Sequence, residues 1–363
     1  MRPNWRERSS QKGGLGGMEA LMVFAVSLII TFIAYRYTVA KGMVDIPNSR
    51  SSHTRPTPRG GGVSFVLTYS AYLVVSGLRH TVDRNTVIAL IGGGLMIAFV
   101  GWIDDRNSLS SSSRFMVHIA SAVWAIWWIN LHQLDLGIIR LTENLLIHSL
   151  GTVMIVWFIN LFNFMDGIDG IASVEAASCG LAIWVLSRGA AGAAVAGLTL
   201  VLAASVMGFL PMNWSPAKIF MGDVGSGYLG FMIGALSIAS EGLGGPPFWI
   251  WAVLVGVFIT DATLTLIRRI TGGERWHEPH RSHVYQLAVQ AGHSHRKVTA
   301  LVLAANLCLA AICLFSRGRL NSGLLTVAPF ATLTGLHIML YNRWREGAGS
   351  RSIRVRGSMH HSG

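Results

Sequence analysis

Charged side chains are scarce in this sequence. Only 13% of its 363 residues are Asp, Glu, Lys or Arg, while 52% are hydrophobic. An ordinary soluble domain is roughly 25% charged. Several long stretches contain no charged residue at all. This composition argues against a water-soluble globule and favours a protein that lies in a membrane.

Cysteine is equally rare, with three residues in the whole chain. Cys179, Cys308 and Cys313 all fall inside hydrophobic runs rather than between them. No disulfide framework follows from such positions. There is no CxxC pair and no Cys/His spacing typical of zinc. Neither disulfides nor structural zinc is therefore expected to stabilise the fold.

The uncharged runs have the length of membrane spans. About 20 apolar residues cross a hydrocarbon core of roughly 30 Å as a helix. Together with further apolar runs that carry at most one acid each, the uncharged runs give eleven candidate spans with only short loops between them. The sequence therefore predicts an all-α polytopic membrane protein with one multi-span domain over residues 18–342. The candidate spans are residues 20–34, 60–78, 86–103, 115–134, 145–164, 171–186, 190–210, 219–240, 246–267, 298–315 and 320–341.

The excess of basic residues indicates an orientation. The net charge is +12, and the 29 Lys and Arg residues lie between the spans rather than within them. With eleven crossings, nineteen fall on one side of the membrane and ten on the other. The positive-inside rule makes the richer side cytoplasmic. We therefore expect the N-terminus outside, a basic cytoplasmic tail over residues 343–363, and no nucleic-acid partner.

Four basic residues in the first twelve positions oppose this orientation. One explanation is that residues 1–17 form a polar, glycine-rich extension and that Met18 begins the working protein. The alternative is that Met1 is the true start. The sequence leaves both open.

Acidic residues gather at one predicted membrane face. Asp104 and Asp105 close the third span, Asp166 and Asp169 close the fifth, and Asp223 opens the eighth. Any one of them could simply cap a helix. Five acids from three spans would repel one another, and a divalent cation would remove that penalty. Mg²⁺, with Mn²⁺ as an alternative, is the expected ion, because it binds one or two carboxylates together with substrate phosphates.

Local spacing supports a phosphate site. Asn163, Asp166 and Asp169 recur every three residues and would share one helix face. Asp223 lies among small residues at a helix start, where exposed N–H groups favour an anion. Helix packing through glycine is the alternative explanation. Asp261 differs from these five acids in depth, because it lies seven residues before Arg268, roughly 10 Å along a helix, and a functional role is the default for such a residue.

Two basic loops are predicted on the same face. Residues 48–62 combine arginines with glycines and suit phosphate oxygens, although a juxtamembrane anchor to anionic lipid is an alternative. Residues 275–283 include His280, Arg281 and His283. For these histidines we favour phosphate contacts or proton transfer over metal ligation, because zinc sites do not ordinarily contain an arginine and a proline.

Taken together, these motifs resemble a known family. The arginine- and glycine-rich segment over residues 55–62, Asp104-Asp105, residues 163–170, residues 220–226 and the final histidine loop occur in family order. They resemble the polyprenyl-phosphate N-acetylhexosamine-1-phosphate transferases, which include phospho-MurNAc-pentapeptide translocase. The last loop, residues 280–286, looks most like that of the O-antigen-initiating branch.

The resemblance implies a reaction and its participants. Sugar 1-phosphate would pass from a UDP-N-acetylhexosamine to undecaprenyl phosphate with release of UMP, in the presence of Mg²⁺. The implied location is the bacterial inner membrane, with the active site on the cytoplasmic face, and a homodimer is compatible. The sugar is not identified by the sequence.

The resemblance also implies roles for individual residues. Asp223 looks like the metal ligand, and Asp104 and Asp105 look like an acidic pair near the acceptor phosphate. Phe220 is similar to an aromatic side chain that stacks on uracil. The remaining residues that the resemblance assigns to substrate binding are Asn163, Asp166, Asn213, Arg59 and Arg281, and those assigned to the catalytic centre are Asp169, His280 and His283.

Two other classes of protein remain as rivals. A transporter would use intramembrane carboxylates, usually near the bilayer midplane and beside broken helices, but only Asp261 is predicted to lie deep. A structural membrane protein would have no reason to gather acids, glycines and histidines on one side. Both rivals therefore explain the acids less well than a transferase does.

Overall fold

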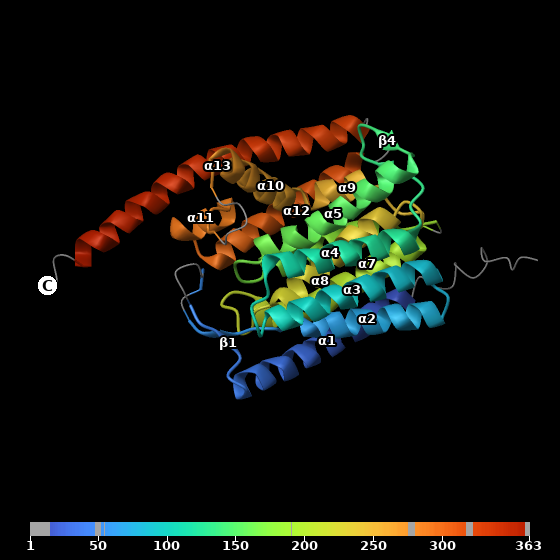
Figure 1. Ribbon diagram of the computed structural model, residues 1–363, viewed down its shortest axis with the longest axis horizontal. Coiled ribbons are helices and arrows are strands. Elements are labelled where there is room, and N and C mark those ends of the chain that lie inside the picture. Colours follow the sequence, from blue (N-terminus) through green and yellow to red (C-terminus); the bar gives the residue numbers. More distant parts are fainter. Residues whose placement is uncertain are drawn as a thin grey trace, which may run out of the picture.

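The computed structural model describes residues 15–47, 52–53, 55–189, 191–274, 280–316 and 322–359. Over these residues the chain is an almost entirely helical bundle whose helices run roughly side by side (Figure 1). The all-α class predicted from the sequence is confirmed. The helices are α1 (Leu15–Ala40), α2 (Val63–Leu78), α3 (Arg84–Asp104), α4 (Ser111–Ile129), α5 (Asn144–Met165), α6 (Ile171–Leu186), α7 (Ala193–Asn213), α8 (Asp223–Ala239), α9 (Phe248–Leu254), α10 (Gly256–Thr271), α11 (Val284–Gln290), α12 (His295–Ser316) and α13 (Ser322–Met359).

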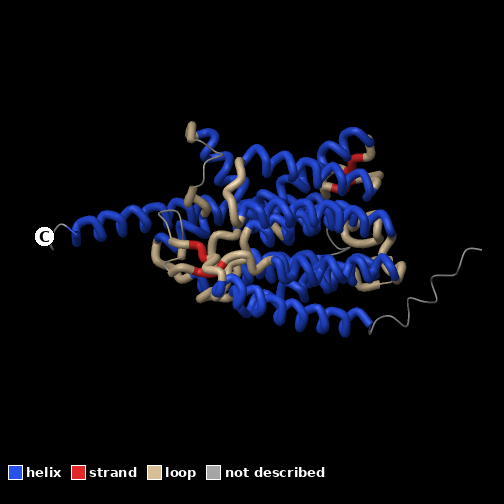
Figure 2. Tube along the Cα trace, turned by 60° about the horizontal axis from the view of Figure 1, so that its bottom comes forward, coloured by secondary structure: helices blue, strands red, loops and turns tan. Residues whose placement is uncertain are grey.

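Two short antiparallel ribbons lie at opposite ends of the bundle (Figure 1). At one end β1 (Val44–Asp45) pairs with β2 (Thr57–Pro58), with Val44 opposite Pro58. At the other end β3 (Leu134–Asp135) pairs with β4 (Arg140–Leu141). Figure 2 shows these four short strands in red, and the rest of the described chain is helix or loop. The β1–β2 end is the one that carries Asp104, Asp105, Asp166, Asp169 and Asp223.

Helix α8 forms the centre of the bundle. Every residue from Val224 to Ala239 is buried, and α3 and α5 pack along its two sides. Glycines let these helices approach closely: a Cβ added at Gly230 would lie 2.3 Å from the carbonyl oxygen of Phe158 on α5. Such small-residue contacts are typical of helix packing in membranes. The first residue of α8, Asp223, is therefore held in a fixed position.

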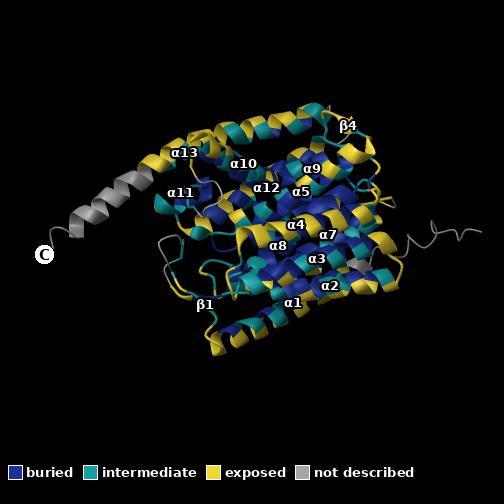
Figure 3. Cartoon of the chain, in the orientation of Figure 1, coloured by how far each residue is buried: buried dark blue, intermediate teal, exposed yellow. Residues whose placement is uncertain are grey.

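The outer surface of the bundle is apolar. Exposed residues on α4 and α5 include Met116, Trp127 and Leu145, the last with 84% of its surface accessible, and Figure 3 shows exposed residues along the outer faces of α1, α4 and α13. A soluble protein rarely exposes contiguous apolar patches of this extent. The surface is that of a protein surrounded by lipid.

The predicted number of eleven crossings is not confirmed. Each predicted span overlaps a helix, but in the described chain only six are long and apolar enough to cross a membrane by themselves: α1, α3, α5, α7, α12 and the first part of α13. Helices α9 and α10 meet at a bend of 78° and make a seventh span if they act as one. Three further apolar helices, α2, α6 and α8, have 16 or 17 residues. Helix α8 is at the lower end of the length range for a span, about 17 residues, and α2 and α6 are one residue shorter. The orientation stays a prediction.

The predicted terminal segments are only partly described. Helix α1 begins at Leu15, so most of the proposed extension over residues 1–17 lies outside the described residues. The starts of two predicted spans, Ala190 and Leu320, also lie outside them. The proposed tail over residues 343–363 continues α13 as helix as far as Met359, and this helix projects beyond the bundle in Figure 1.

Close packing of α3 on α8 gives a first testable prediction. A Cβ at Gly101 would lie 2.5 Å from the backbone of Asp223 and 2.6 Å from Val224 N, and neither backbone atom can move without displacing α8. We expect Gly101→Ala to destabilise the protein by about 1–3 kcal/mol, seen as a lower melting temperature in detergent. Gly335→Ala is the control, since an added Cβ there meets no atom within 4 Å. Equal melting temperatures for the two variants would contradict this packing.

Candidate functional site

Five acidic residues from three parts of the chain meet at the β1–β2 end of the bundle. Asp104 ends α3 and Asp105 follows it, Asp166 and Asp169 lie in the turn between α5 and α6, and Asp223 begins α8. The sequence predicted that these acids would share one face of the membrane. Their convergence at one end of the bundle agrees with that prediction.

Asp105 fastens the end of α3 to the start of α8. Its Oδ1 accepts a hydrogen bond from Asp223 N at 2.8 Å, and its Oδ2 accepts one from Val224 N at 3.2 Å. These are backbone amides that a helix leaves without partners at its first turn. Gly222 has a φ of +77° and passes so close to Asp105 that an added Cβ would lie 2.4 Å from Oδ2. Both oxygens of Asp105 are therefore committed to positioning α8.

Arg59 brings a cation to the same place. Its backbone forms a parallel bridge with Phe220, which aligns the segment after β2 with the segment before α8. The guanidinium then reaches two acids, with Nε 2.8 Å from Asp105 Oδ1 and Nη2 2.7 Å from Asp223 Oδ1. Burial acts to lower the pKa of Arg59, but Asp223 and Asp105 raise it above its ordinary value. Arg59 is thus a permanent positive charge beside Asp223.

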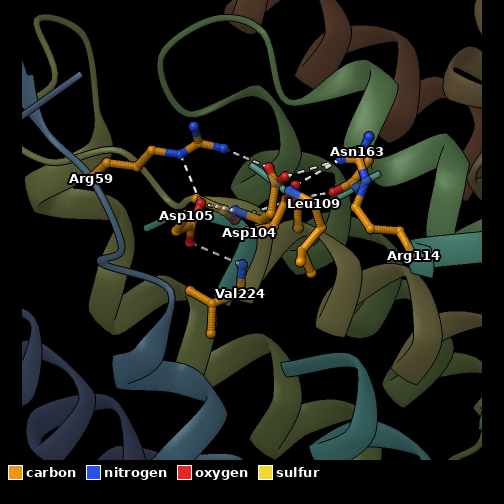
Figure 4. A network of polar contacts seen from close by, with 10 residues as sticks. Arg59, Asp104, Asp105, Leu109, Arg114, Asn163 and Val224 are labelled. Carbon is orange, nitrogen blue, oxygen red and sulfur yellow. Dashed lines mark hydrogen bonds and ion pairs between the residues drawn. The ribbon is translucent and has the colours of Figure 1, made fainter. Parts of the chain in front are cut away.

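Arg114, on α4, approaches the acids from the opposite side, as Figure 4 shows. Its Nη1 lies 2.8 Å from Asp104 Oδ2 and 3.5 Å from Asp223 Oδ2. Asp104 also accepts a hydrogen bond from Leu109 N at 2.6 Å. Sequence reasoning counted Arg114 only as a basic loop residue. Arg114 lies in the first turn of the helix that follows the acid pair, and this nearness in the chain was the feature that could have identified it.

A polar cavity opens beside Asp223. It encloses about 900 Å³ of empty space, part of it open to solvent. Several residues predicted from the sequence line it: Arg59, Asn163, Asp166, Asp169, Asn213, Phe220 and Asp223. Others that sequence reasoning did not select also line it: Asp45, His53, Ser226, Gln286 and His295. We call this space the polar cavity.

Asn163 and Asp166 form one wall of the polar cavity. Asn163 Oδ1 accepts a hydrogen bond from the hydroxyl of Ser226 on α8, which fixes the end of α5 against α8. Burial and the nearby Asp223 raise the pKa of Asp166 well above its ordinary value. Two carboxylates that share a buried space without a cation disfavour full ionisation.

Asp169 is tied to the start of α12. Its Oδ1 lies 3.1 Å from His295 Nδ1, and its Oδ2 accepts a hydrogen bond from Ala217 N at 3.2 Å. Burial acts to raise the pKa of Asp169, but the hydrogen bond with His295 outweighs it and holds that pKa below its ordinary value. His295 Nε2 in turn lies 3.1 Å from the carbonyl oxygen of Ser52. His295 therefore links three segments around the cavity, although nothing in its sequence neighbourhood distinguished it.

Phe220 presents an aromatic ring to the polar cavity. The ring packs edge-on against His53, with 4.8 Å between centroids. The loop that carries Phe220 is held by Asn213, whose Nδ2 donates to the carbonyl oxygen of Ile219 at 3.1 Å and whose Oδ1 accepts from Ser173 Oγ at 3.1 Å. Asn213 thus shapes the cavity wall through contacts with its own protein.

The histidine loop lies apart from the polar cavity, since none of His280, Arg281 and His283 lines it. His280 packs on His283 with 4.9 Å between centroids, and its Nδ1 lies 2.9 Å from Ser282 Oγ. Burial and the nearby His283 lower the pKa of His280 to about 4, so this ring is neutral at pH 7. The Arg281 carbonyl accepts a hydrogen bond from Gln290. The preceding residues 275–279 lie outside the described chain, and the roles of all three residues stay predictions.

Asp261, the deep acid, positions the histidine loop. Its carboxylate accepts hydrogen bonds from Val284 N at 3.0 Å and Tyr285 N at 3.2 Å. His283 and His337 each place a ring nitrogen 3.4 Å from Asp261 Oδ1. These contacts occupy the carboxylate with the first turn of α11 and with α13. Asp261 thereby holds α11 in place, and through it Gln286 in the cavity wall.

The side chains around Asp223 fit a magnesium ion better than a transition metal. In the part of the chain that the structure describes, no three His, Cys, Asp or Glu side chains are grouped to enclose a metal. Asp223 and Asp166 nevertheless line one cavity, and burial, together with repulsion by Asp223, raises the pKa of Asp166. Mg²⁺ is usually held by one or two carboxylates, waters and substrate phosphates. Such an ion would remove the repulsion between the two acids.

Known proteins with similar sequences are named for one type of reaction, the transfer of N-acetylglucosamine 1-phosphate to a polyprenyl phosphate. Residues 87–241 match the profile of the family described as glycosyl transferase family 4. The chain is 33% identical to the probable undecaprenyl-phosphate N-acetylglucosaminyl 1-phosphate transferase of Bacillus subtilis, over 76% of this chain and 79% of that protein. It is 30% identical to the decaprenyl-phosphate N-acetylglucosaminephosphotransferase of Mycolicibacterium smegmatis, over 81% of each chain. It is 29% identical to the undecaprenyl-phosphate alpha-N-acetylglucosaminyl 1-phosphate transferase of Salmonella typhi, over 81% of this chain and 82% of that protein.

Proposed function

Because the chain belongs to glycosyl transferase family 4, we propose that it transfers N-acetylhexosamine 1-phosphate from a UDP-sugar to undecaprenyl phosphate and releases UMP. The names of its relatives support the general reaction, transfer of a sugar 1-phosphate to a polyprenyl phosphate. The family resemblance indicated by the motifs is thereby confirmed. The identity of the donor and of the sugar belongs to the proposal.

One observation carries the proposal. A single cavity at one end of a membrane bundle combines carboxylates, a fixed arginine and an aromatic ring, contributed by Asp166, Asp223, Arg59 and Phe220. A nucleoside diphosphate sugar requires these groups together, since its base stacks on aromatic rings and its phosphates need positive charge. The position of the cavity at the bundle end suits an acceptor that remains in the lipid.

Different residues of the polar cavity are assigned to different parts of the donor. We assign the uracil to Phe220 and the uridine end of the donor to Asn163 and Asp166. The diphosphate lies toward Asp223 and Arg59. Magnesium, when bound by Asp223 with Asp166 nearby, supplies positive charge that stabilises the leaving phosphate.

The acceptor needs little chemical activation. A phosphate monoester has a second pKa near 6, so at pH 7 it is largely a dianion. One of its oxygens attacks the sugar-linked phosphorus of the donor. A new phosphorus–oxygen bond forms, the bond to the bridging oxygen breaks, and UMP leaves with that electron pair. No proton needs to be removed from the dianion for this step.

Electrostatic repulsion is the main barrier to this attack. The dianion must approach a diphosphate in a site where the dielectric constant is low. Arg59 and Arg114 lie on two sides of Asp223 and offset this repulsion with fixed positive charge. Asp104 holds Arg114 in place, while Asp105 holds both Arg59 and the start of α8. The acid pair therefore acts through the groups that it positions.

A transporter is not favoured. Its coupling carboxylates would lie near the bilayer midplane and be free to exchange an ion. Asp261, the acid placed in mid-helix, accepts two backbone N–H groups and lies beside two histidines. Asp104, Asp105, Asp166, Asp169 and Asp223 lie at the β1–β2 end of the bundle.

The cellular setting follows from the reaction. The multi-pass membrane character and the bacterial relatives support a bacterial membrane enzyme. We propose that it works in the inner membrane with the polar cavity at the cytoplasmic face, where nucleotide sugars are made. Its product would begin O-antigen or another cell-envelope polysaccharide, and a homodimer is compatible with this role.

A direct assay tests the proposed reaction. Purified protein receives undecaprenyl phosphate, Mg²⁺ and each of a panel of UDP-N-acetylhexosamines, and UMP release is measured together with the mass of the lipid product. We expect one sugar to give equal amounts of UMP and lipid-linked sugar diphosphate, and chelation of Mg²⁺ to stop both. Absence of a lipid product with every sugar would contradict the proposal.

The assignment of Phe220 to uracil gives a second testable prediction. We expect Phe220→Ala to raise the KM for the UDP-sugar by roughly 5- to 150-fold, because stacking on a base contributes about 1–3 kcal/mol. Phe99→Ala is a matched control, since Phe99 is exposed on α3 and does not line the polar cavity. Steady-state kinetics with varied donor measures both. An unchanged KM in Phe220→Ala would exclude stacking on this ring.

A further inference from the structure

A second hollow lies between the ends of α1 and α3, on the lipid-facing side of the bundle. It encloses about 1860 Å³ of empty space, part of it open to the surroundings. Its α1 wall is apolar and accessible, with Ile33 58% and Tyr37 50% exposed, and Figure 3 shows that this end of α1 is exposed over most of its surface. Trp102 on α3 faces the same space. We call this hollow the α1–α3 groove.

The end of the α1–α3 groove nearest β1 is polar and carries an excess of positive charge. Lys41, Arg59 and Arg106 line it, against Asp45 and Asp105. Arg59 and Asp105 form an ion pair, so Lys41 and Arg106 remain as two cations facing a single acid. The Arg106 guanidinium lies 3.9 Å above the Trp102 ring, a contact that holds this charge over the groove.

The residue types place this end of the groove at the level of lipid headgroups. Tyrosine and tryptophan are enriched at the membrane–water interface, and Tyr37 and Trp102 occur on the two walls. Lys41 and Arg106 follow them by four residues along their helical segments. An apolar slot that ends in two cations is complementary to a lipid whose headgroup carries a phosphate.

The α1–α3 groove adjoins the polar cavity without opening directly onto its phosphate site. Arg59 and Asp45 line both spaces. The ion pair between Arg59 and Asp105 stands between the groove and Asp223. A phosphate at Lys41 and Arg106 would lie behind this pair. It would therefore be poorly placed to attack a donor held on the other side.

We propose that the α1–α3 groove binds an anionic phospholipid of the bilayer, with its phosphodiester between Lys41 and Arg106 and an acyl chain along α1. A phosphodiester carries one negative charge and is a poor nucleophile, so such a lipid does not compete as an acceptor.

The bound lipid would steady Arg59. The segment that follows Lys41 pairs with the segment that carries Arg59, through the hydrogen bond from Arg59 N to Met43 O at 3.3 Å and the register of Val44 with Pro58. A lipid that holds Lys41 restrains this ribbon and so favours the arrangement in which Arg59 meets Asp223. The groove is therefore an activating lipid site as well as a binding site.

Lipid binding is tested first by fluorescence quenching. The protein is placed in nanodiscs of phosphatidylcholine containing a small fraction of phosphatidylglycerol, with bromine on the acyl chains of one lipid at a time. The Trp102 signal is the difference between the wild type and Trp102→Phe. We expect brominated phosphatidylglycerol to quench Trp102 more than its share of the lipid predicts. In the double variant Lys41→Gln/Arg106→Gln we expect the apparent affinity for phosphatidylglycerol to fall about 30-fold, because each cation contributes roughly 5- to 6-fold.

Arg36→Gln is the matched control for this experiment. Arg36 is exposed on α1 close to Lys41 but does not line the α1–α3 groove, so its loss changes surface charge alone. We expect Arg36→Gln to retain the preference for phosphatidylglycerol. Equal quenching by the two lipids in the wild type, or an equal loss in Arg36→Gln and the double variant, would overturn the proposal.

Kinetics distinguishes a phospholipid from the polyprenyl phosphate acceptor. This part of the test rests on the proposed function, whereas quenching does not, so the two can fail separately. In pure phosphatidylcholine we expect the double variant to match the wild type in turnover and in KM for undecaprenyl phosphate. With phosphatidylglycerol present, only the wild type should gain activity. An acceptor KM that rises about 30-fold in the double variant would assign the groove to the acceptor and overturn the proposal.

Discussion

Asp223→Asn should abolish sugar-phosphate transfer, with a fall in turnover of about 10³-fold. The carboxylate of Asp223 opens α8 beside the polar cavity and lies 2.7 Å from Arg59 and 3.5 Å from Arg114. Asparagine has nearly the same shape but no charge, so it should bind a magnesium ion much more weakly and cannot balance the two arginines. UMP release by purified variant in detergent measures the effect.

Two comparisons separate this loss from misfolding. Asp135→Asn makes the same chemical change at the opposite end of the bundle, where Asp135 pairs with Arg140 at 2.9 Å, and it should keep full activity. The melting temperature of Asp223→Asn should remain close to that of the wild type, since the hydrogen bond from its backbone to Asp105 is retained. Normal activity that still depends on magnesium would remove Asp223 as the metal ligand.

Asp105→Asn should lower both activity and stability. The wild-type carboxylate accepts two backbone N–H groups of α8 and also pairs with Arg59. An asparagine has only one acceptor oxygen, so its NH₂ group must face one of those N–H groups. A buried donor without a partner costs about 1–3 kcal/mol, and the ion pair with Arg59 is also lost. We expect turnover to fall by about 10²-fold through misplacement of Asp223 and Arg59.

The two losses together identify Asp105 as a positioning residue. Thermal unfolding and turnover should be measured on the same preparation, with Asp135→Asn again as the control. A stable Asp105→Asn that has lost activity would instead mean that Asp105 touches a substrate. The contrast with Asp223→Asn, which should be inactive but stable, makes the roles of the two acids distinguishable.

The fold class could be predicted because hydropathy is a local property. Each predicted apolar run forms a helix or a bent pair of helices, and the acids at the ends of those runs lie at one end of the bundle. The number of crossings could not be predicted in the same way. Helices α2, α6 and α8 are near the minimum length of a span, and α9 and α10 bend by 78°, which depends on how they pack.

The contents of the candidate site were predicted only in part. Asp166, Asp169 and Asp223 do line one cavity together with Phe220. Arg114 and His295 were missed. Each lies in the first turn of a helix, and apart from the nearness of Arg114 to the acid pair in the chain, no local pattern distinguishes them. The deep position of Asp261 suggested direct function, but burial alone cannot reveal that its oxygens accept the backbone amides of α11.

By itself, the sequence determined that this protein is a helical membrane protein with acids at one face and the motifs of its family, because chain order and side-chain polarity suffice for both. Only the tertiary structure decided which charges meet. Asp105 and the amide of Asp223 are 118 residues apart in the chain, and Arg59 is 164 residues from the carboxylate it pairs with on α8. Such contacts are fixed by the close packing of α3 against α8 and by the pairing of the segment after β2 with the segment before α8. No local sequence pattern encodes the distance between residues so far apart in the chain.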